Sequence, residues 1–225
     1  MAFEMSTVEY SGIINEVVLG SAQTFTVGGE TAYPFLLFEG EMPHKPKIAM
    51  EIWDKDPGED WPAAAKAPFA DVLGDPGAWA KKCVEFGADI IMVQLKSTDP
   101  NAEDKGGAEA VAVVKAVLEA VDVPVGVYGV SNDQKDIETL SAVAEEFQGK
   151  NLILGPVEDK NHKQIGAQAL AYGHTIAANT PIDVNLAKQL NILLDNLGVT
   201  TEKILIDPTT GGLGYGMEYC YSVME

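Results

Sequence analysis

The chain has 225 residues, of which 46% are hydrophobic, and this length can bury the core of one large domain or of two small ones. It carries 34 Asp and Glu residues against 15 Lys and Arg residues, a formal net charge of −19. Because such a surface repels phosphate groups, we expect neither nucleic acid nor an anionic membrane surface as a partner. The simplest role of the acidity is to keep the protein soluble.

The cysteine content excludes several kinds of site. The two cysteines are Cys83 and Cys220, and no Cys-x-x-Cys pair occurs. Two thiols cannot by themselves hold a four-cysteine iron–sulfur cluster or a structural zinc ion, and they form no disulfide framework. The N-terminal sequence lacks the basic and apolar regions of a signal peptide, and no apolar run reaches the ~18 residues of a transmembrane helix. We therefore expect a cytoplasmic protein.

The first part of the chain is predicted to be β-strand and turn. Residues 16–20 and 24–29 are short apolar runs joined by Ser-Ala-Gln, a pattern typical of a β-hairpin. Residues 54–77 contain four prolines and are predicted to form a loop. We describe 1–46 as a hairpin with its lead-in, and 47–225 as the remainder of a single domain.

From residue 47 onward, short apolar strands alternate with helices. The predicted strands are 47–52, 88–95, 123–129, 151–155, 174–179 and 203–207. The predicted helices are 78–86, 107–121, about 131–147, 160–172, 183–197 and 217–225. Continuous apolar strands that alternate with helices indicate a parallel sheet that is buried on both faces.

Two α/β architectures satisfy this alternation, namely a doubly wound open sheet and a (β/α) barrel. No Gly-x-Gly-x-x-Gly motif follows the first of these strands, which argues against a dinucleotide-binding Rossmann domain. A complete barrel needs eight strands, and the sequence predicts six.

In both architectures the chemistry takes place just beyond the carboxyl ends of the strands. The polar residues that stand out there are Asn179, at the end of the fifth strand, and Asp207, at the end of the sixth, with Thr209 just beyond it. Asp207 has an alternative role as a simple cap of the turn that follows it. The three histidines lie in a loop, at a helix start and at a strand start, so we expect them to be structural or exposed rather than metal ligands.

Four glycines follow Asp207 closely, namely Gly211, Gly212, Gly214 and Gly216. A turn requires one or two glycines, whereas four create a surface at which backbone N–H groups can approach a ligand or a partner. A phosphate fits poorly, because the chain is acidic and Lys203 lies at the other end of the strand. A flat ring or a partner protein fits better.

Several sequence blocks resemble one known family. In chain order they are VVLG, TFTVGGE, PFLLFEGEMPHKPKIAMEIWD, DWP, NTPIDVNLAKQLNILL and ILIDPTTGGLGYGMEYCYSVME. From about residue 14 to the last residue, the chain resembles the small (delta) subunit of the corrinoid iron–sulfur protein, which belongs to the CO dehydrogenase/acetyl-CoA synthase complex. The Asp-Pro-x-x-Gly-Gly-x-Gly-Tyr-Gly block is the most specific part, and it also resembles the sixth-strand motif of pterin-binding barrels such as dihydropteroate synthase.

The resemblance implies a (β/α)8 TIM barrel whose bottom is closed by the N-terminal hairpin. Only about six βα units are present, which we interpret as a sign of an incomplete chain. The resemblance also implies a heterodimer with a large subunit that carries a [4Fe–4S] cluster and a corrinoid. The corrinoid takes a methyl group from a methyl-tetrahydropterin to acetyl-CoA synthase, so the methyltransferase and acetyl-CoA synthase are the expected transient partners.

On this interpretation Asn179, Asp207, Thr209, Gly211 and Gly212 line the barrel mouth and cover the corrinoid through backbone proximity and hydrogen bonds. They include no metal ligand and no catalytic residue. The alternative is an independent pterin-binding methyltransferase, in which Asn179 and Asp207 bind the pterin ring. The third and fourth strand tips read Val-Tyr-Gly-Val and Gly-Pro-Val, and their lack of Asp and Asn disfavours that alternative. A phosphate-binding barrel would use loops after a seventh and an eighth strand, which the sequence does not contain.

Overall fold

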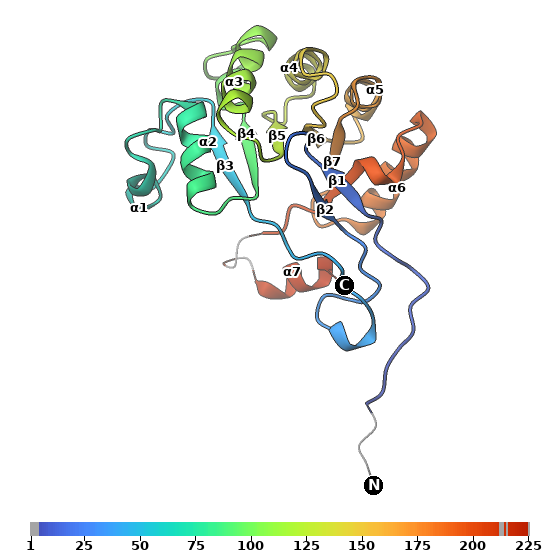
Figure 1. The fold of residues 1–225 in the computed structure, drawn as a ribbon. Helices are drawn as coiled ribbons and strands as arrows, with labels where there is room; N and C mark the ends of the chain where they lie inside the picture. The colour runs from blue at the N-terminus through green and yellow to red at the C-terminus, as the bar shows by residue number, and fades with distance from the viewer. Residues whose placement is uncertain (1–4, 212–213, 215, 225) are drawn as a thin grey trace.

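The computed structural model describes residues 5–211, 214 and 216–224, and its fold is α/β (Figure 1). A sheet of six parallel strands forms its centre. The strands are β3 (Ala49–Trp53), β4 (Ile90–Gln94), β5 (Val125–Tyr128), β6 (Ile153–Val157), β7 (Thr175–Asn179) and β8 (Ile204–Asp207). All of the strands predicted for this sheet are confirmed, and only their ends shift.

The strands lie side by side in chain order, from β3 at one end of the sheet to β8 at the other. A doubly wound sheet needs a point at which the strand order reverses, and the described part of the chain has none. Because crossovers between parallel strands share one hand, an unreversed order places every helix on the same face. Of the two architectures that the sequence leaves open, the structure matches the TIM-barrel-like one.

The helices cover one face of the sheet as an arc, which runs from α2 round to α6 in Figure 1. They are α2 (Pro76–Glu85), α3 (Gly107–Ala120), α4 (Asp133–Glu146), α5 (His162–Tyr172) and α6 (Val184–Leu197). The side chains of Asn132 and Asp183 cap α4 and α6, because they accept hydrogen bonds from first-turn N–H groups of these helices. Gly198 ends α6 in the left-handed conformation, with φ of 96°.

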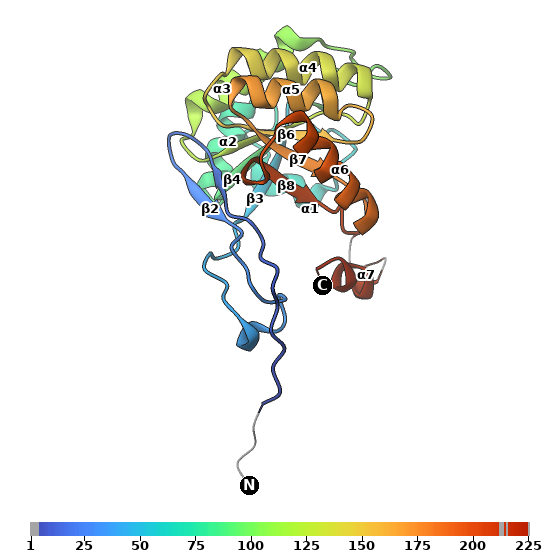
Figure 2. The same cartoon turned by 90° about the vertical axis from the view of Figure 1, so that its right-hand side faces the viewer.

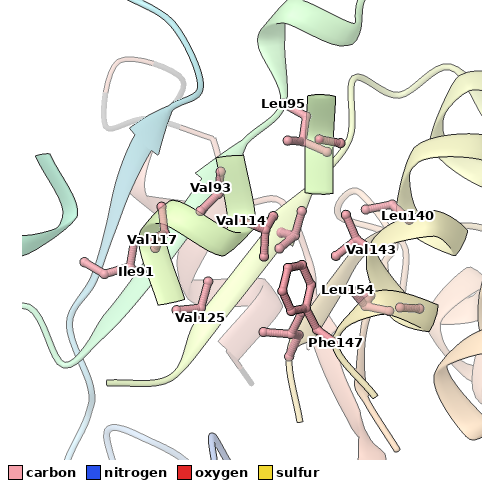
Figure 3. Close-up of a cluster of buried hydrophobic side chains, with 14 of the residues drawn as sticks. Ile91, Val93, Leu95, Val114, Val117, Val125, Leu140, Val143, Phe147 and Leu154 are labelled. Carbon is pink, nitrogen blue, oxygen red and sulfur yellow. The ribbon is translucent and has the colours of Figure 1, made fainter. Parts of the chain in front are cut away.

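The outward side chains of the strands form the main core together with the helices. Ile91 and Val93 of β4, Val125 of β5 and Leu154 of β6 are buried in this cluster. Figure 3 shows them beside side chains of α3 and α4 and of the residue after α4, namely Val114, Val117, Leu140, Val143 and Phe147. Burying each such side chain contributes about 1.5–3 kcal/mol, so this layer fixes the sheet against the helices.

The inward face of the sheet packs against an N-terminal hairpin. Its strands, β1 (Val17–Leu19) and β2 (Phe25–Val27), pair antiparallel as predicted. Val17 and Leu19 are buried against inward residues that include Ile90 and Ile153. Because these two residues open β4 and β6, the hairpin lies against the amino ends of the strands.

The prediction that 54–77 is a loop throughout is wrong. The segment contains the short helix α1 (Ala63–Lys66) and the 3-10 helix η2 (Ala67–Phe69). Pro62 precedes α1 with φ of −64°, which suits a helix start, and three alanines then favour the helix. The tryptophan nearby, Trp61, packs edge-on against Trp53 and Trp79, with ring centroids 5.6 and 5.5 Å apart. The three tryptophans therefore serve in packing.

The remaining elements are short. They are η1 (Leu37–Glu39), η3 (Lys96–Thr98), η4 (Thr201–Lys203) and α7 (Met217–Met224). Figure 2 shows the N-terminal lead-in extending away from the sheet. The segment between β2 and β3 meets α7, where the rings of Phe35 and Tyr221 stack with their centroids 4.6 Å apart. Among the described helices, none has the length and apolar character needed to cross a membrane.

Candidate functional site

The carboxyl ends of the strands carry a polar layer on the inward face of the sheet. In the strand register Gln94 pairs with Tyr128, and Asn179 pairs with Asp207. Successive strand residues point to opposite faces, so these positions share a face with the apolar residues that contact the hairpin. The hairpin occupies the amino half of that face, and the polar layer occupies the carboxyl half. Two of the predicted site residues, Asn179 and Asp207, are therefore direct neighbours.

Asp207 lies at the centre of a hydrogen-bond network. Its Oδ1 accepts from the N–H of Thr209 at 2.9 Å. Its Oδ2 accepts from the hydroxyl of Tyr128 at 2.8 Å and from Asn179 Nδ2 at 3.2 Å. Asn179 Nδ2 also donates to Thr209 Oγ1 at 2.6 Å. The structure thus joins three predicted residues, and the bond to Thr209 N–H shows that Asp207 caps the turn as well.

Of the predicted glycines, Gly211 makes a contact outside this network. The carbonyl oxygen of Gly211 accepts a hydrogen bond from Cys220 Sγ at 3.2 Å, which ties the loop to α7. Gly212 lies outside the described residues. Gly216 has φ of 111°, in the region that favours glycine. The approach of these backbone groups to a ligand stays a prediction.

Tyr128 is the member of the network that the sequence prediction omitted from the site. Its side chain starts on β5 and its hydroxyl reaches Asp207 on β8. Gly155, its register partner on β6, makes this possible, because a Cβ built there would lie 2.7 Å from Tyr128 Cε2. An aromatic residue at a strand tip, opposite a glycine on the next strand, is the sequence signal that could have identified it.

The electrostatics of the network favour binding over proton transfer. Burial raises the pKa of Tyr128 far above its ordinary value, and the neighbouring charge of Asp207 raises it further. The phenol therefore keeps its proton at neutral pH and donates it to Asp207. The Asp207 carboxylate already accepts from Tyr128, Asn179 and Thr209. Tyr128 is therefore not placed to act as a general base, and three of the about four lone pairs of the Asp207 carboxylate are already taken by donors of the same chain.

Gly155→Ala tests the packing of Tyr128. We expect the free energy of unfolding in urea to fall by about 1–3 kcal/mol, the usual cost of overpacking, because the new methyl group would overlap the tyrosine ring. Gly74→Ala is the matched control, since a Cβ built at Gly74 meets nothing within 4 Å. Equal stability of the two variants would show that Tyr128 does not pack on Gly155.

Asp136 is a fully buried carboxylate next to the tip of β5. Its Oδ1 accepts from the N–H of Val130 at 2.8 Å. In the described part of the chain, its Oδ2 is among the few buried side-chain atoms without a hydrogen-bond partner. Burial raises the pKa of Asp136 to about 6, and the bond from Val130 opposes that rise. A Cβ at Gly129 would lie 2.1 Å from Asp136 Oδ1, so a glycine is needed directly after Tyr128.

This carboxylate makes the stability pH-dependent. The folded protein holds the Asp136 proton more tightly than the unfolded chain, whose pKa is near 3.8. The extra stability is complete below about pH 4 and is lost as the pH rises through about 6, a change of about 3 kcal/mol. In urea unfolding between about pH 4 and pH 7, we expect Asp136→Asn to reduce this loss. The control Asp195→Asn, at an exposed position of α6, should keep it. An unaltered pH profile in Asp136→Asn would refute the assignment.

The histidines take structural positions. His174 is buried, and its Nδ1 accepts a hydrogen bond from the N–H of Leu152 at 3.1 Å. Its Nε2 lies 2.9 Å from the carbonyl oxygen of Ala144. Burial lowers the pKa of His174, so the ring is neutral and joins α4 to the strands. Within the described residues, no group of three or more His, Cys, Asp or Glu side chains is arranged to hold a metal ion.

Comparison with known proteins places this chain in a family. The profile of the "CO dehydrogenase/acetyl-CoA synthase delta subunit" family matches residues 16–225. The acetyl-CoA decarbonylase/synthase complex subunit delta of Archaeoglobus fulgidus is 39% identical over 99% of this chain and 51% of its own length. Subunit delta 1 of Methanosarcina thermophila is 37% identical over 99% of this chain and 53% of its own length. The corresponding subunit of Methanocaldococcus jannaschii is 36% identical over 99% of this chain and 56% of its own length.

The chain spans about half the length of the curated relatives it matches. The family profile nevertheless covers the hairpin, all six parallel strands and the loop with the glycines. The chain therefore belongs to the CO dehydrogenase/acetyl-CoA synthase delta subunit family.

Proposed function

We propose that this chain is the small subunit of a corrinoid iron–sulfur protein, and that it pairs with a large subunit and covers the corrinoid held there. The large subunit would also carry the [4Fe–4S] cluster. The bound corrinoid supplies the methyl-transfer chemistry, between a methyl-tetrahydropterin and acetyl-CoA synthase. Support comes from family membership, since the relatives are named as subunits of the acetyl-CoA decarbonylase/synthase complex. We place the complex in the cytoplasm, with the methyltransferase and acetyl-CoA synthase as its transient partners.

The observation that carries the non-catalytic role is the closed network around Asp207. An active-site carboxylate needs free lone pairs for the substrate, whereas three of the about four lone pairs of Asp207 already accept from donors of its own chain. Tyr128, which supplies one of these protons, does not release it at neutral pH. Such a network shapes a surface and holds it rigid, which is what a cover for another subunit's cofactor requires.

We place the corrinoid over the carboxyl ends of the strands, because the hairpin occupies the amino ends. Asn179, Asp207, Thr209, Gly211 and Gly212 are the residues proposed to face it. The exposed hydroxyl of Thr209 and the half-buried amide of Asn179 suit hydrogen bonds to the amide groups on the rim of a corrin ring. The role of these residues is to bind and orient, without a ligand to the cobalt.

We further propose that two βα units complete the sheet to an eight-stranded barrel between β8 and β3. Ile206, on the outward side of β8, is 53% exposed, whereas Ile176 on β7 and Val127 on β5 are fully buried by helices. A helix that packs over β8 would cover Ile206 in the same way. The matched relatives contain enough additional sequence for such units.

An independent pterin-binding methyltransferase is the second candidate. The specific observation in its favour is that Asn179 and Asp207 are register partners, because an amide beside a carboxylate can bind the N–H groups of a planar ring. The hydroxyl of Tyr128 argues against it, since it already occupies Asp207 Oδ2.

Co-expression tests the proposed function. The whole open reading frame is expressed alone and together with the gene of the large subunit, and each product is measured for subunit ratio and visible absorption. We expect an equimolar complex with the absorption of a corrinoid, and no corrinoid on the chain alone. A chain that ignores the large subunit and binds methyl-tetrahydropterin by itself would support the methyltransferase instead.

A further inference from the structure

We infer that Tyr128 is a specificity-determining residue whose ring fills a subsite for a small planar ligand at the carboxyl end of the sheet. The floor of this subsite is formed by Gly155 and Ala177, and its polar wall by Asp207 and Asn179. The inference rests on the proposed function, in which this chain covers a corrinoid held by the large subunit. It adds a reason why the chain itself would bind no small planar ring.

The residues of the floor have almost no side chain. A Cβ built on Gly155 would lie 2.7 Å from Tyr128 Cε2, 2.9 Å from Tyr128 Cζ and 3.0 Å from the Cβ of Ala177. Tyr128 Cε2 and Cζ therefore approach the backbone of β6 closely, with β7 beside it. The space that the ring fills exists only because these strand positions carry almost no side chain, and a planar ring of a ligand could fill the same space.

The neighbouring strand pair repeats this arrangement. Met92 of β4 lies over its register partner Gly126 on β5, where a Cβ would be 2.3 Å from the methionine sulfur. Tyr128 lies in the same way over its own partner, Gly155, one strand further along. Two long side chains thus lean over glycines of the next strand, and the second one ends at Asp207. These two side chains of the chain itself thereby fill part of the inward face of the sheet.

The polar wall defines the class of ligand that is excluded. Asp207 Oδ2 accepts from the Tyr128 hydroxyl at 2.8 Å and from Asn179 Nδ2 at 3.2 Å. A planar heterocycle with adjacent N–H donors, such as an aminopyrimidinone, pairs with a carboxylate through the same lone pairs. To bind, it would have to break the tyrosine bond and displace the ring from Gly155. Because Tyr128 stays protonated across the neutral range, a change of pH in that range does not open the subsite.

A purely mechanical role for Tyr128 makes a different prediction. If the side chain only ties β5 to β8, its removal weakens the sheet and creates no affinity for a ligand. If it fills a subsite, its removal creates a pocket with a glycine and an alanine on its floor and a carboxylate in its wall, and this pocket binds planar rings with N–H donors. Ligand binding by a variant therefore distinguishes the two roles, and stability alone does not.

The probe is 2-amino-4-hydroxypteridine, a fluorescent planar ring with adjacent N–H and NH₂ donors. It is titrated into the wild type, Tyr128→Ala, Tyr128→Phe and the double variant Tyr128→Ala/Asp207→Asn. We expect Tyr128→Ala to bind at least about tenfold more tightly than the wild type. Tyr128→Phe should resemble the wild type, because its ring still fills the space. The double variant should lose the gain, because the carboxylate is absent.

Three results would overturn the inference. One is wild-type affinity equal to that of Tyr128→Ala, another is a cooperatively melting Tyr128→Ala that gains no affinity, and the third is a gain that survives Asp207→Asn. If Tyr128→Ala does not melt cooperatively, Tyr128→Val takes its place, since it suits a strand and still vacates the subsite. The proposed function is judged separately, by corrinoid in the wild-type complex, so its failure would be recognised independently of the probe.

Discussion

Trp79→Ala is expected to lower the free energy of unfolding by about 3–5 kcal/mol, because Trp79 is the largest fully buried side chain among the described residues. It lies on α2 and contacts Trp61 edge-on and Phe69 at a tilt, with ring centroids 5.5 and 6.0 Å apart. Its removal leaves a cavity between α2 and the 54–77 segment that the short helices cannot close. Urea unfolding followed by circular dichroism measures the loss.

Two controls separate the cavity from other effects. Trp79→Phe should cost less, because it keeps an aromatic ring and removes an indole N–H that has no hydrogen-bond partner in the described structure. Phe86→Ala, at a position that is about half exposed, should cost less than about 1.5 kcal/mol. A loss for Trp79→Ala as small as that for Phe86→Ala would show that the tryptophan does not hold α2 in place.

Asn151→Ala is expected to cost about 2–4 kcal/mol and to release the hairpin. Asn151 Nδ2 donates to the carbonyl oxygens of Val18 and Gly20 at 2.8 and 3.1 Å. Its Oδ1 accepts from Thr175 Oγ1 at 3.0 Å and from Lys203 Nζ at 2.7 Å. One side chain thus joins the hairpin to the amino ends of three strands, and alanine supplies none of these bonds.

The backbone of Asn151 adds to this cost. Its φ is 49°, a conformation that asparagine tolerates better than alanine does. Asn151→Gly loses the same hydrogen bonds without that strain, so the difference between the two variants measures the backbone contribution. Hydrogen exchange of amides in 17–27 should accelerate in both. Unchanged exchange there would mean that other contacts, such as those of Val17 and Leu19, are sufficient to hold the hairpin.

The strands and helices could be predicted because local pattern and tertiary environment agree. The runs that become β4 and β5 are apolar at consecutive positions, as strands buried on both faces must be. The caps Asn132 and Asp183 act within their own helix turns, so spacing alone identifies them. The choice between a barrel-like and a doubly wound sheet depended on strand order, which no local pattern contains.

The site could be predicted in part, for a related reason. Asn179 and Asp207 were identified because both end strands, and parallel strands bring their ends together. Tyr128 was omitted because its role depends on Gly155 and Ala177, two small residues on other strands that leave room for its ring. Asp136 was not identified because its position on α4 resembles a solvated first-turn acid, and only the structure shows its burial.

Hydrogen–deuterium exchange of the complex tests the central claim most directly, namely that the carboxyl ends of the strands face the partner's corrinoid. Exchange is measured for the chain alone and for the chain bound to the large subunit with its corrinoid. We predict slower exchange in the complex for 128–132, 179–183 and 207–211, and unchanged exchange for 16–29. Protection confined to the hairpin, with no change at the strand ends, would contradict the account.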